Sequence, residues 1–360
     1  MNATKGRDSN SSPRLTNLCH VTEGTLRVAP LLVLFRLLAD HCVNSDAVIR
    51  EIGCEPALFR DPENAIGFST VGRLLVHAAE VSALPYPGLE FGSLAGLEVL
   101  GMLGEAIRLA PDVGTALRAL ILYFHLHDRG AIPSLWESRD FTMFGYTLYC
   151  PDTPGVDHIY DAALAISHNV LSELVGKQWK STEVLMFREP PADIAPFRRH
   201  FGSRLRFRTE HAAIVFPTDY LARPLPSADP GAYAKAISKL ENMDGANDAS
   251  LFENKVRRVL YRKLIGGRGP YGIDLDEIAQ LFELHPRTLN RRLRAEGTTF
   301  ITLLNESRCY VAQQLLRDTH LQIAEIAFLL GYAESASFNH AFRRWTGIAA
   351  SRWRSSNRLD

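Results

Sequence analysis

Arginine and asparagine side chains recur at helical spacing over residues 287–294. On a helix with 100° per residue, Leu289 and Leu293 share one face. The opposite face then carries a polar ridge formed by Arg287, Asn290, Arg291 and Arg294. Arginine can pair bidentately with guanine O6 and N7, asparagine can pair with adenine N6 and N7, and the major groove admits one helix. The ridge therefore has the chemistry needed to read base edges in double-stranded DNA.

A second polar ridge follows closer to the C-terminus. It is smaller and less charged than the first, so we expect it to add less direct base specificity, and it comprises Ser335, Ala336, Asn339, His340 and Arg343. The alternative for either ridge is a solvated helix face with no partner, which is the usual explanation of a single run of charge.

An internal repeat connects the two ridges. The segment 277–282 (EIAQLF) matches 325–330 (EIAFLL) at an offset of 48 residues, and each segment passes through a short turn into the helix that bears a ridge. This pattern predicts two helix-turn-helix units, at about 274–295 and 322–345. Gly331 can adopt the left-handed conformation that ends a helix. Glu283 holds the matching position in the first unit. A residue other than glycine adopts the left-handed conformation at a cost of up to about 1–2 kcal/mol, so we expect the first turn to be built differently.

The formal net charge of zero hides a division along the chain. Residues 251–360 hold 17 Lys and Arg against 11 Asp and Glu, a net charge of +6, and residues 1–250 carry −6. Two polar ridges on the basic part of the chain favour a polyanionic partner.

The C-terminal region resembles the AraC/XylS family of bacterial transcription regulators. The resemblance rests on residues 326–332 (IAFLLGY), 337–347 (SFNHAFRRWTG) and the pair Trp353-Arg354, and it covers about residues 251–356. One departure is Ala350, where the family usually has proline. The resemblance implies a seven-helix DNA-binding domain in which a long helix, about Phe300–Asp318, sets the spacing of two units. It also assigns base contacts to Arg287, Asn290 and Arg291 and to Ser335, Ala336, Asn339 and His340.

The preceding region predicts an α+β domain, with helices first and an antiparallel or mixed sheet later. Apolar residues recur at helical spacing over 30–128 and 157–175, and strands are expected at 140–150, 183–188, 204–209 and 212–217. We therefore expect a disordered tail at 1–17, a sensing and dimerisation domain at 18–226, a linker at 227–250 and an all-α DNA-binding domain at 251–360.

The N-terminal domain is also similar to the "arabinose-binding" sensor of a subset of the family. The similarity lies in residues 91–94 (FGSL), 205–207 (LRF), 213–217 (AIVFP) and 224–226 (PLP), and it does not establish a sugar as the effector. An effector pocket would be mostly apolar. The candidate aromatic residues, which more often belong to a core, are Tyr123, Phe124, Trp136, Tyr146 and Tyr149.

Other functional classes have little support. His125, His127 and Asp128 are possible metal ligands, but positions i and i+2 of a helix point apart, so we expect a helix end there instead. The five scattered cysteines indicate neither a disulfide framework nor a thiolate zinc site. No nucleophile elbow, zinc-protease motif or phosphate loop occurs. We expect no cofactor, no catalysis and no membrane span, and a cytoplasmic location.

These observations predict a transcription regulator whose promoter binding or activation responds to a small-molecule effector. Its expected partners are promoter DNA, RNA polymerase and a second copy of the chain. Two alternatives remain: an enzyme-like N-terminal domain fused to a DNA-binding module, and a constitutive DNA-binding protein without an effector.

Overall fold

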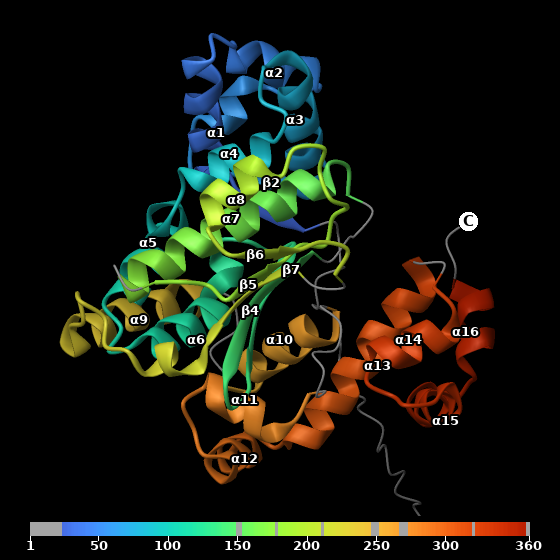
Figure 1. Ribbon diagram of the computed structural model, residues 1–360. Coiled ribbons are helices and arrows are strands. Elements are labelled where there is room, and N and C mark those ends of the chain that lie inside the picture. The colour runs from blue at the N-terminus through green and yellow to red at the C-terminus, as the bar shows by residue number, and fades with distance from the viewer. Residues whose placement is uncertain are drawn as a thin grey trace, which may run out of the picture.

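The computed structural model describes residues 24–148, 153–176, 179–209, 212–245, 252–265, 273–318 and 321–357. Within these residues the chain has an α+β N-terminal part and an all-helical C-terminal part, as predicted (Figure 1). The tail expected at 1–17 lies outside the described residues. In the described part of the chain, no helix combines the length and the apolar character that a bilayer span requires.

A five-stranded mixed sheet forms the centre of the N-terminal part. Its order is β3-β4-β7-β5-β6, and the neighbours are antiparallel except for the parallel pair β5 and β6. Phe144 and Ile214 lie opposite each other in the register of β4 and β7, and both are buried. The strands are β3 (Ala131–Glu137), β4 (Phe141–Leu148), β5 (Glu183–Leu185), β6 (Arg204–Arg206) and β7 (Ala212–Pro217). A separate pair joins β1 (Thr25–Arg27) and β2 (Ala65–Gly67).

Helix α7 (Val156–Val175) packs between the sheet and the N-terminal helices (Figure 1). Helix α4 (Pro87–Ser93) lies very close to α7 because Gly88 and Gly92 have no Cβ. A Cβ at either position would meet the backbone of His158 or Ala162 within 3 Å. The other N-terminal helices are α1 (Ala29–Asp40), α2 (Ser45–Glu51), α3 (Phe68–Val81), α5 (Met102–Arg108), α6 (Val113–Tyr123) and α8 (Ala195–Phe201). Short 3-10 turns are η1 (Pro56–Phe59), η2 (Leu97–Leu100), η3 (Phe124–Leu126) and η4 (Thr218–Ala222).

The predicted linker is largely helical. Residues Pro230–Gly245 form α9, which packs on α5, and Leu240 is 1% exposed. Residues 230–245 of the predicted linker therefore pack on the N-terminal part, because this segment buries an apolar residue. Residues 246–250 lie outside the described residues.

Seven helices form the described C-terminal part from residue 252 onward. The expected spacer appears with its expected bounds as α13 (Phe300–Asp318). The others are α10 (Phe252–Ile265), α11 (Leu275–Leu281), α12 (Pro286–Ala295), α14 (Ile323–Leu329), α15 (Ser335–Thr346) and α16 (Ala350–Asn357). Ala350, which stands where the family usually has proline, is fully buried at the start of α16.

The hydrophobic cores do not follow the boundary expected from the sequence. One core runs from the N-terminal part through α9 and α10 into the first helix-turn-helix unit, and includes Leu240, Val259 and Leu289. A second, smaller core holds α14 and α15 together and includes Phe338 and Phe342. The first helix-turn-helix unit is thus packed as an extension of the N-terminal part.

The aromatic residues considered for a pocket divide into several groups. Phe124 and Tyr146 line a cavity of the N-terminal part. The hydroxyl of Tyr123 donates to Glu241 on α9 at 3.4 Å, and Trp136 is half-buried on β3. Tyr149 lies outside the described residues.

Candidate DNA interface

The first helix-turn-helix unit is built as the repeat predicted. The side chain of Asp274 caps α11 by accepting a hydrogen bond from the backbone N–H of Glu277 at 2.7 Å. His285 caps α12 in the same way, with Nδ1 accepting from the N–H of Arg287 at 3.2 Å. Leu289 and Leu293 are fully buried. The inward face of α12 is therefore the one expected from the sequence.

Three arginines occupy the outer face of α12. Arg287, Arg291 and Arg294 are exposed, and none of them forms an ion pair with another described residue. Their guanidinium groups are available to bases or phosphates because no carboxylate of the described chain neutralises them.

Asn290 differs from its arginine neighbours. Its side chain is half-buried, and Oδ1 accepts a hydrogen bond from the backbone N–H of Phe300 at 3.3 Å, at the start of α13. A bidentate contact with adenine uses both the oxygen and the nitrogen of the amide. Asn290, expected to point outward with the arginines, is thus less exposed than they are, and its side chain already connects α12 to α13.

The second unit repeats the design with different capping groups. A capping box starts α14, in which the N–H of Gln322 donates to the Glu325 carboxylate at 2.6 Å. Phe338 and Phe342 of α15 are fully buried. On the outer side, Ser335, Ala336, His340 and Arg343 are exposed and Asn339 is half-buried.

The turns of the two units are closed by the same hydrogen bonds. In the first, the N–H of Leu284 donates to the carbonyl of Ala279 at 2.9 Å, and in the second Tyr332 donates to Ala327 at 2.9 Å. Glu283 has φ 54° and Gly331 has φ 98°. The expectation of a differently built first turn is therefore wrong, because Glu283 adopts the left-handed conformation that was expected to exclude it.

Basic residues elsewhere in this part stabilise the fold. Arg257 pairs with Glu253 and with Glu306, the latter at 2.7 Å, and Lys263 pairs with Glu277. Arg308 and Arg354 donate to backbone carbonyls. The sequence interpretation missed two further exposed arginines, Arg292 and Arg344, next to the assigned ridges. They directly follow Arg291 and Arg343 in the sequence, and this proximity to the assigned residues could have identified them.

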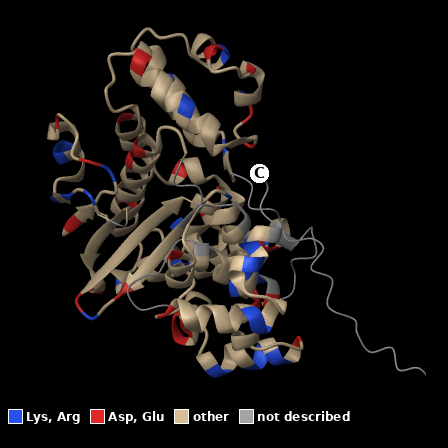
Figure 2. Cartoon of the chain, turned by 90° about the vertical axis from the view of Figure 1, so that its right-hand side faces the viewer, with Lys and Arg blue, Asp and Glu red and all other residues tan. Residues whose placement is uncertain are grey.

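The arrangement in space leaves α12 at the end of the molecule remote from the N-terminal helices α1 to α4 (Figure 1). Figure 2 shows many Lys and Arg residues along the helices at this end. In residues 1–250, by contrast, Asp and Glu outnumber Lys and Arg. Helices α12 and α15 both carry exposed arginines, and one continuous helix of 19 residues, α13, lies between the two units in the chain.

Comparison with known protein families agrees with this geometry. Residues 43–225 match the model described as the arabinose-binding domain of AraC transcription regulators, N-terminal, and residues 278–356 match a helix-turn-helix domain. The chain belongs to the AraC family of transcription regulators. This assignment covers both parts of the chain and confirms the resemblance noted in the sequence.

Individual members of the AraC family are similar over most of their length. An ornithine utilization regulator of Pseudomonas aeruginosa is 26% identical over 91% of this chain and 95% of its own. The regulator VirS of Mycobacterium tuberculosis is 29% identical over 85% of this chain and 93% of its own. The crystal structure of the regulator CdpR from Pseudomonas aeruginosa aligns with TM-score 0.47 and 22% identity over 91% of this chain and 98% of its own. Each of these relatives is a regulator by name.

Proposed function

We propose that this AraC-family chain binds specific promoter DNA through α12 and α15 and that a small-molecule effector in the N-terminal part modulates this binding. The main support is the exposed, unpaired arginine face of α12, formed by Arg287, Arg291 and Arg294. The proposed base contacts on α15 are Ser335, Ala336, Asn339, His340 and Arg343. Asn290 contributes mainly by fixing α12 on α13.

Control by an effector requires that the N-terminal part influence the DNA-binding units. The observed packing provides a direct route, because Gln280 on α11 donates through Nε2 to Glu137 on β3 at 2.9 Å. Glu137 also pairs with Arg118 on α6 at 3.3 Å. Apolar residues surround a crevice at the same place, namely Ile121, Pro133 and Leu135 from one part and Val259 and Leu281 from the other.

This packing gives the mechanism a thermodynamic basis. An effector shifts DNA occupancy only by its differential affinity for two arrangements of the protein, typically about 1–3 kcal/mol. The proposal includes a homodimer that acts in the cytoplasm and contacts RNA polymerase. A ligand that alters DNA binding without being consumed distinguishes it from an enzyme fused to a DNA-binding module.

The decisive experiment is footprinting of the full chain on the DNA next to its own gene at several salt concentrations. We expect each copy of the chain to protect two segments about one helical turn (~34 Å) apart on one face of the DNA. Neutralising about six phosphates gives a slope of log affinity against log salt near −5. Protection of a single segment, or a slope near zero, would contradict reading by both units.

A further inference from the structure

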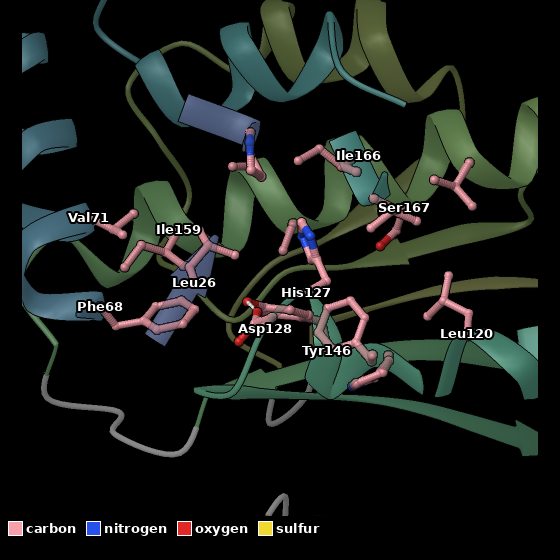
Figure 3. Close-up of a pocket in the computed structure, with 18 of the residues that line it drawn as sticks. Leu26, Phe68, Val71, Leu120, His127, Asp128, Tyr146, Ile159, Ile166 and Ser167 are labelled. Atoms are coloured by element: carbon pink, nitrogen blue, oxygen red, sulfur yellow. Dashed lines mark hydrogen bonds between the residues drawn. The ribbon is translucent and has the colours of Figure 1, made fainter. Parts of the chain in front are cut away.

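A cavity lies in the N-terminal part, between the sheet and α7. Its empty space, open solvent at the mouth included, is about 740 Å³. Side chains from α3, α6, β4 and α7 form its wall, including Phe68, Leu120, Phe144 and Ile159. Figure 3 shows these elements around the space. The wall is almost entirely hydrocarbon, which favours binding of an apolar molecule.

The charged group on the wall is already satisfied. Asp128 accepts hydrogen bonds from the N–H groups of Gly130 at 2.8 Å and Ala131 at 3.0 Å, and from the hydroxyl of Tyr146 at 2.8 Å. No lysine or arginine is among the described residues that line the cavity. An anionic ligand would therefore meet a buried carboxylate with no cation on the wall, since the nearby Arg27 is paired with Glu63. A cationic ligand would lose its hydration for an acceptor already in use.

The imidazole Nδ1 of His127 is a polar atom of the wall without a hydrogen-bond partner among the described residues. The side chain of His127 is 6% exposed. Figure 3 shows its ring within the group formed by Ile166, Ser167, Asp128 and Tyr146. Burial, assisted by the charge of Arg27, lowers the pKa of His127 to about 3, so the ring is neutral near pH 7. A neutral imidazole can donate or accept one hydrogen bond through Nδ1, depending on its tautomer.

Building on the effector control proposed above, we infer that this cavity binds an uncharged, mainly hydrocarbon molecule with one hydroxyl or carbonyl group placed against His127. The hydroxyl of Ser167 offers a second polar contact near the same end. A sugar does not fit this wall, because most of its hydroxyl groups would be buried without partners. The domain's "arabinose-binding" name therefore does not describe the chemistry of the wall.

A set of ten-carbon probes tests the inference on the full chain by titration calorimetry in the absence of DNA. The probes are 1-decanol, decanoate and decylammonium, with L-arabinose as a polar comparison. We expect 1-decanol to bind at least tenfold more tightly than either charged probe, and L-arabinose not to bind. Equal or tighter binding of decanoate or decylammonium would overturn the assignment of an uncharged ligand, and absence of 1-decanol binding would overturn the site.

Matched variants of α7 locate the binding. Ser167→Phe fills the cavity, whereas Ser172→Phe makes the same change on the same helix outside the lining residues. We expect the first to reduce 1-decanol affinity at least tenfold and the second to leave it unchanged. Ala163→Leu, a smaller filling change on the same wall, provides an independent test if Ser167→Phe folds poorly. Undiminished binding in a folded variant of either kind would place the ligand elsewhere.

This assay can fail separately from the proposed function. Footprinting reports promoter recognition whether or not 1-decanol binds. Binding of 1-decanol that is lost in the filled variants supports the cavity assignment even if the footprint is absent. An intact footprint combined with no 1-decanol binding refutes the cavity assignment alone.

Discussion

Glu283 and Gly331 lie 48 residues apart and close equivalent turns of the two helix-turn-helix units, both with positive φ. Only one of them is a glycine. The first unit therefore holds an ordinary side chain in a conformation that costs about 1–2 kcal/mol, whereas the second avoids that cost. The identical hydrogen bonds of the two turns show that the fold requires this conformation whichever residue occupies it.

Placing glycine at position 283 and removing it from position 331 should change the free energy of unfolding in opposite directions. Glu283→Gly relieves backbone strain and should raise the free energy of unfolding by roughly 0.5–1 kcal/mol, after the added entropy of the unfolded chain is subtracted. Gly331→Ala should lower it by about 1–2 kcal/mol. Denaturant unfolding of the full chain measures both. Stabilisation by Gly331→Ala would show that the turn is not left-handed in solution.

Arg291 is expected to read one base. Arg291→Ala should weaken binding to the protected site by about 1–3 kcal/mol and relax the base preference at one position. Competition binding with a set of single-base operator variants measures both effects. Arg60→Ala removes an equally exposed arginine from the N-terminal part and should change neither. Uniform weakening across all the operators would instead assign Arg291 to a phosphate.

The hydrogen bond between Gln280 and Glu137 is expected to hold the first unit against the N-terminal part. Its net contribution is about 0.5–1.5 kcal/mol, so Gln280→Ala should accelerate local opening about two- to tenfold. Hydrogen exchange of backbone amides in β3 and α11 measures this opening. Asp276→Ala, on the exposed side of the same helix, is the control. Unchanged exchange in the Gln280 variant would argue against this contact in solution.

Acid should destabilise the chain through its buried histidines. Burial lowers the pKa of His127 to about 3 and that of His168 to about 4, below the ordinary value of 6.5. The unfolded chain then binds more protons than the folded chain below pH 6.5. Each such histidine lowers the free energy of unfolding by roughly 1.4 kcal/mol per pH unit as the pH falls from 6.5 toward its folded pKa.

His127→Phe isolates one of these groups. We expect the variant to lose the share of the pH dependence that His127 contributes between pH 6.5 and 4, as measured by denaturant unfolding at several pH values. His41→Phe changes an exposed histidine in the same way and should leave the slope unchanged. A His127 variant with the wild-type slope would mean that His127 is protonated, or exposed, in the folded chain.

Elements with strong periodicity were predictable from sequence. Strands β4 and β7 lie within the predicted strands, because aromatic and β-branched residues are frequent there. The bounds of α13 agree with those that the family resemblance implied. Strand β3 was missed, since Pro133 in its middle argues against a strand. Helix α9 was missed because its segment is rich in small and polar residues and includes just one fully buried anchor, Leu240.

The candidate site was only partly predictable. Burial of Leu289 and Leu293 follows from spacing alone, and so does the exposure of Arg287, Arg291 and Arg294. The hydrogen bond from Phe300 to Asn290 depends on how α13 returns to α12, which periodicity does not encode. The packing of the first unit on the N-terminal part depends on which surfaces meet, and no local motif specifies that choice.

The position of β3 in the sheet has a consequence for dissecting the protein. It is an edge strand, and the consecutive residues Pro133, Ser134 and Leu135 all face the crevice shared with α10 and α11. Side chains of neighbouring strand residues point to opposite faces of the sheet. All three residues can therefore line the same crevice only if the free edge of β3 faces the helices. Severing the chain after α9 would leave this edge uncovered, with Pro133 interrupting its row of donors at one point. We therefore expect an N-terminal part truncated after α9 to self-associate through strand addition, because α10 and α11 no longer cover β3.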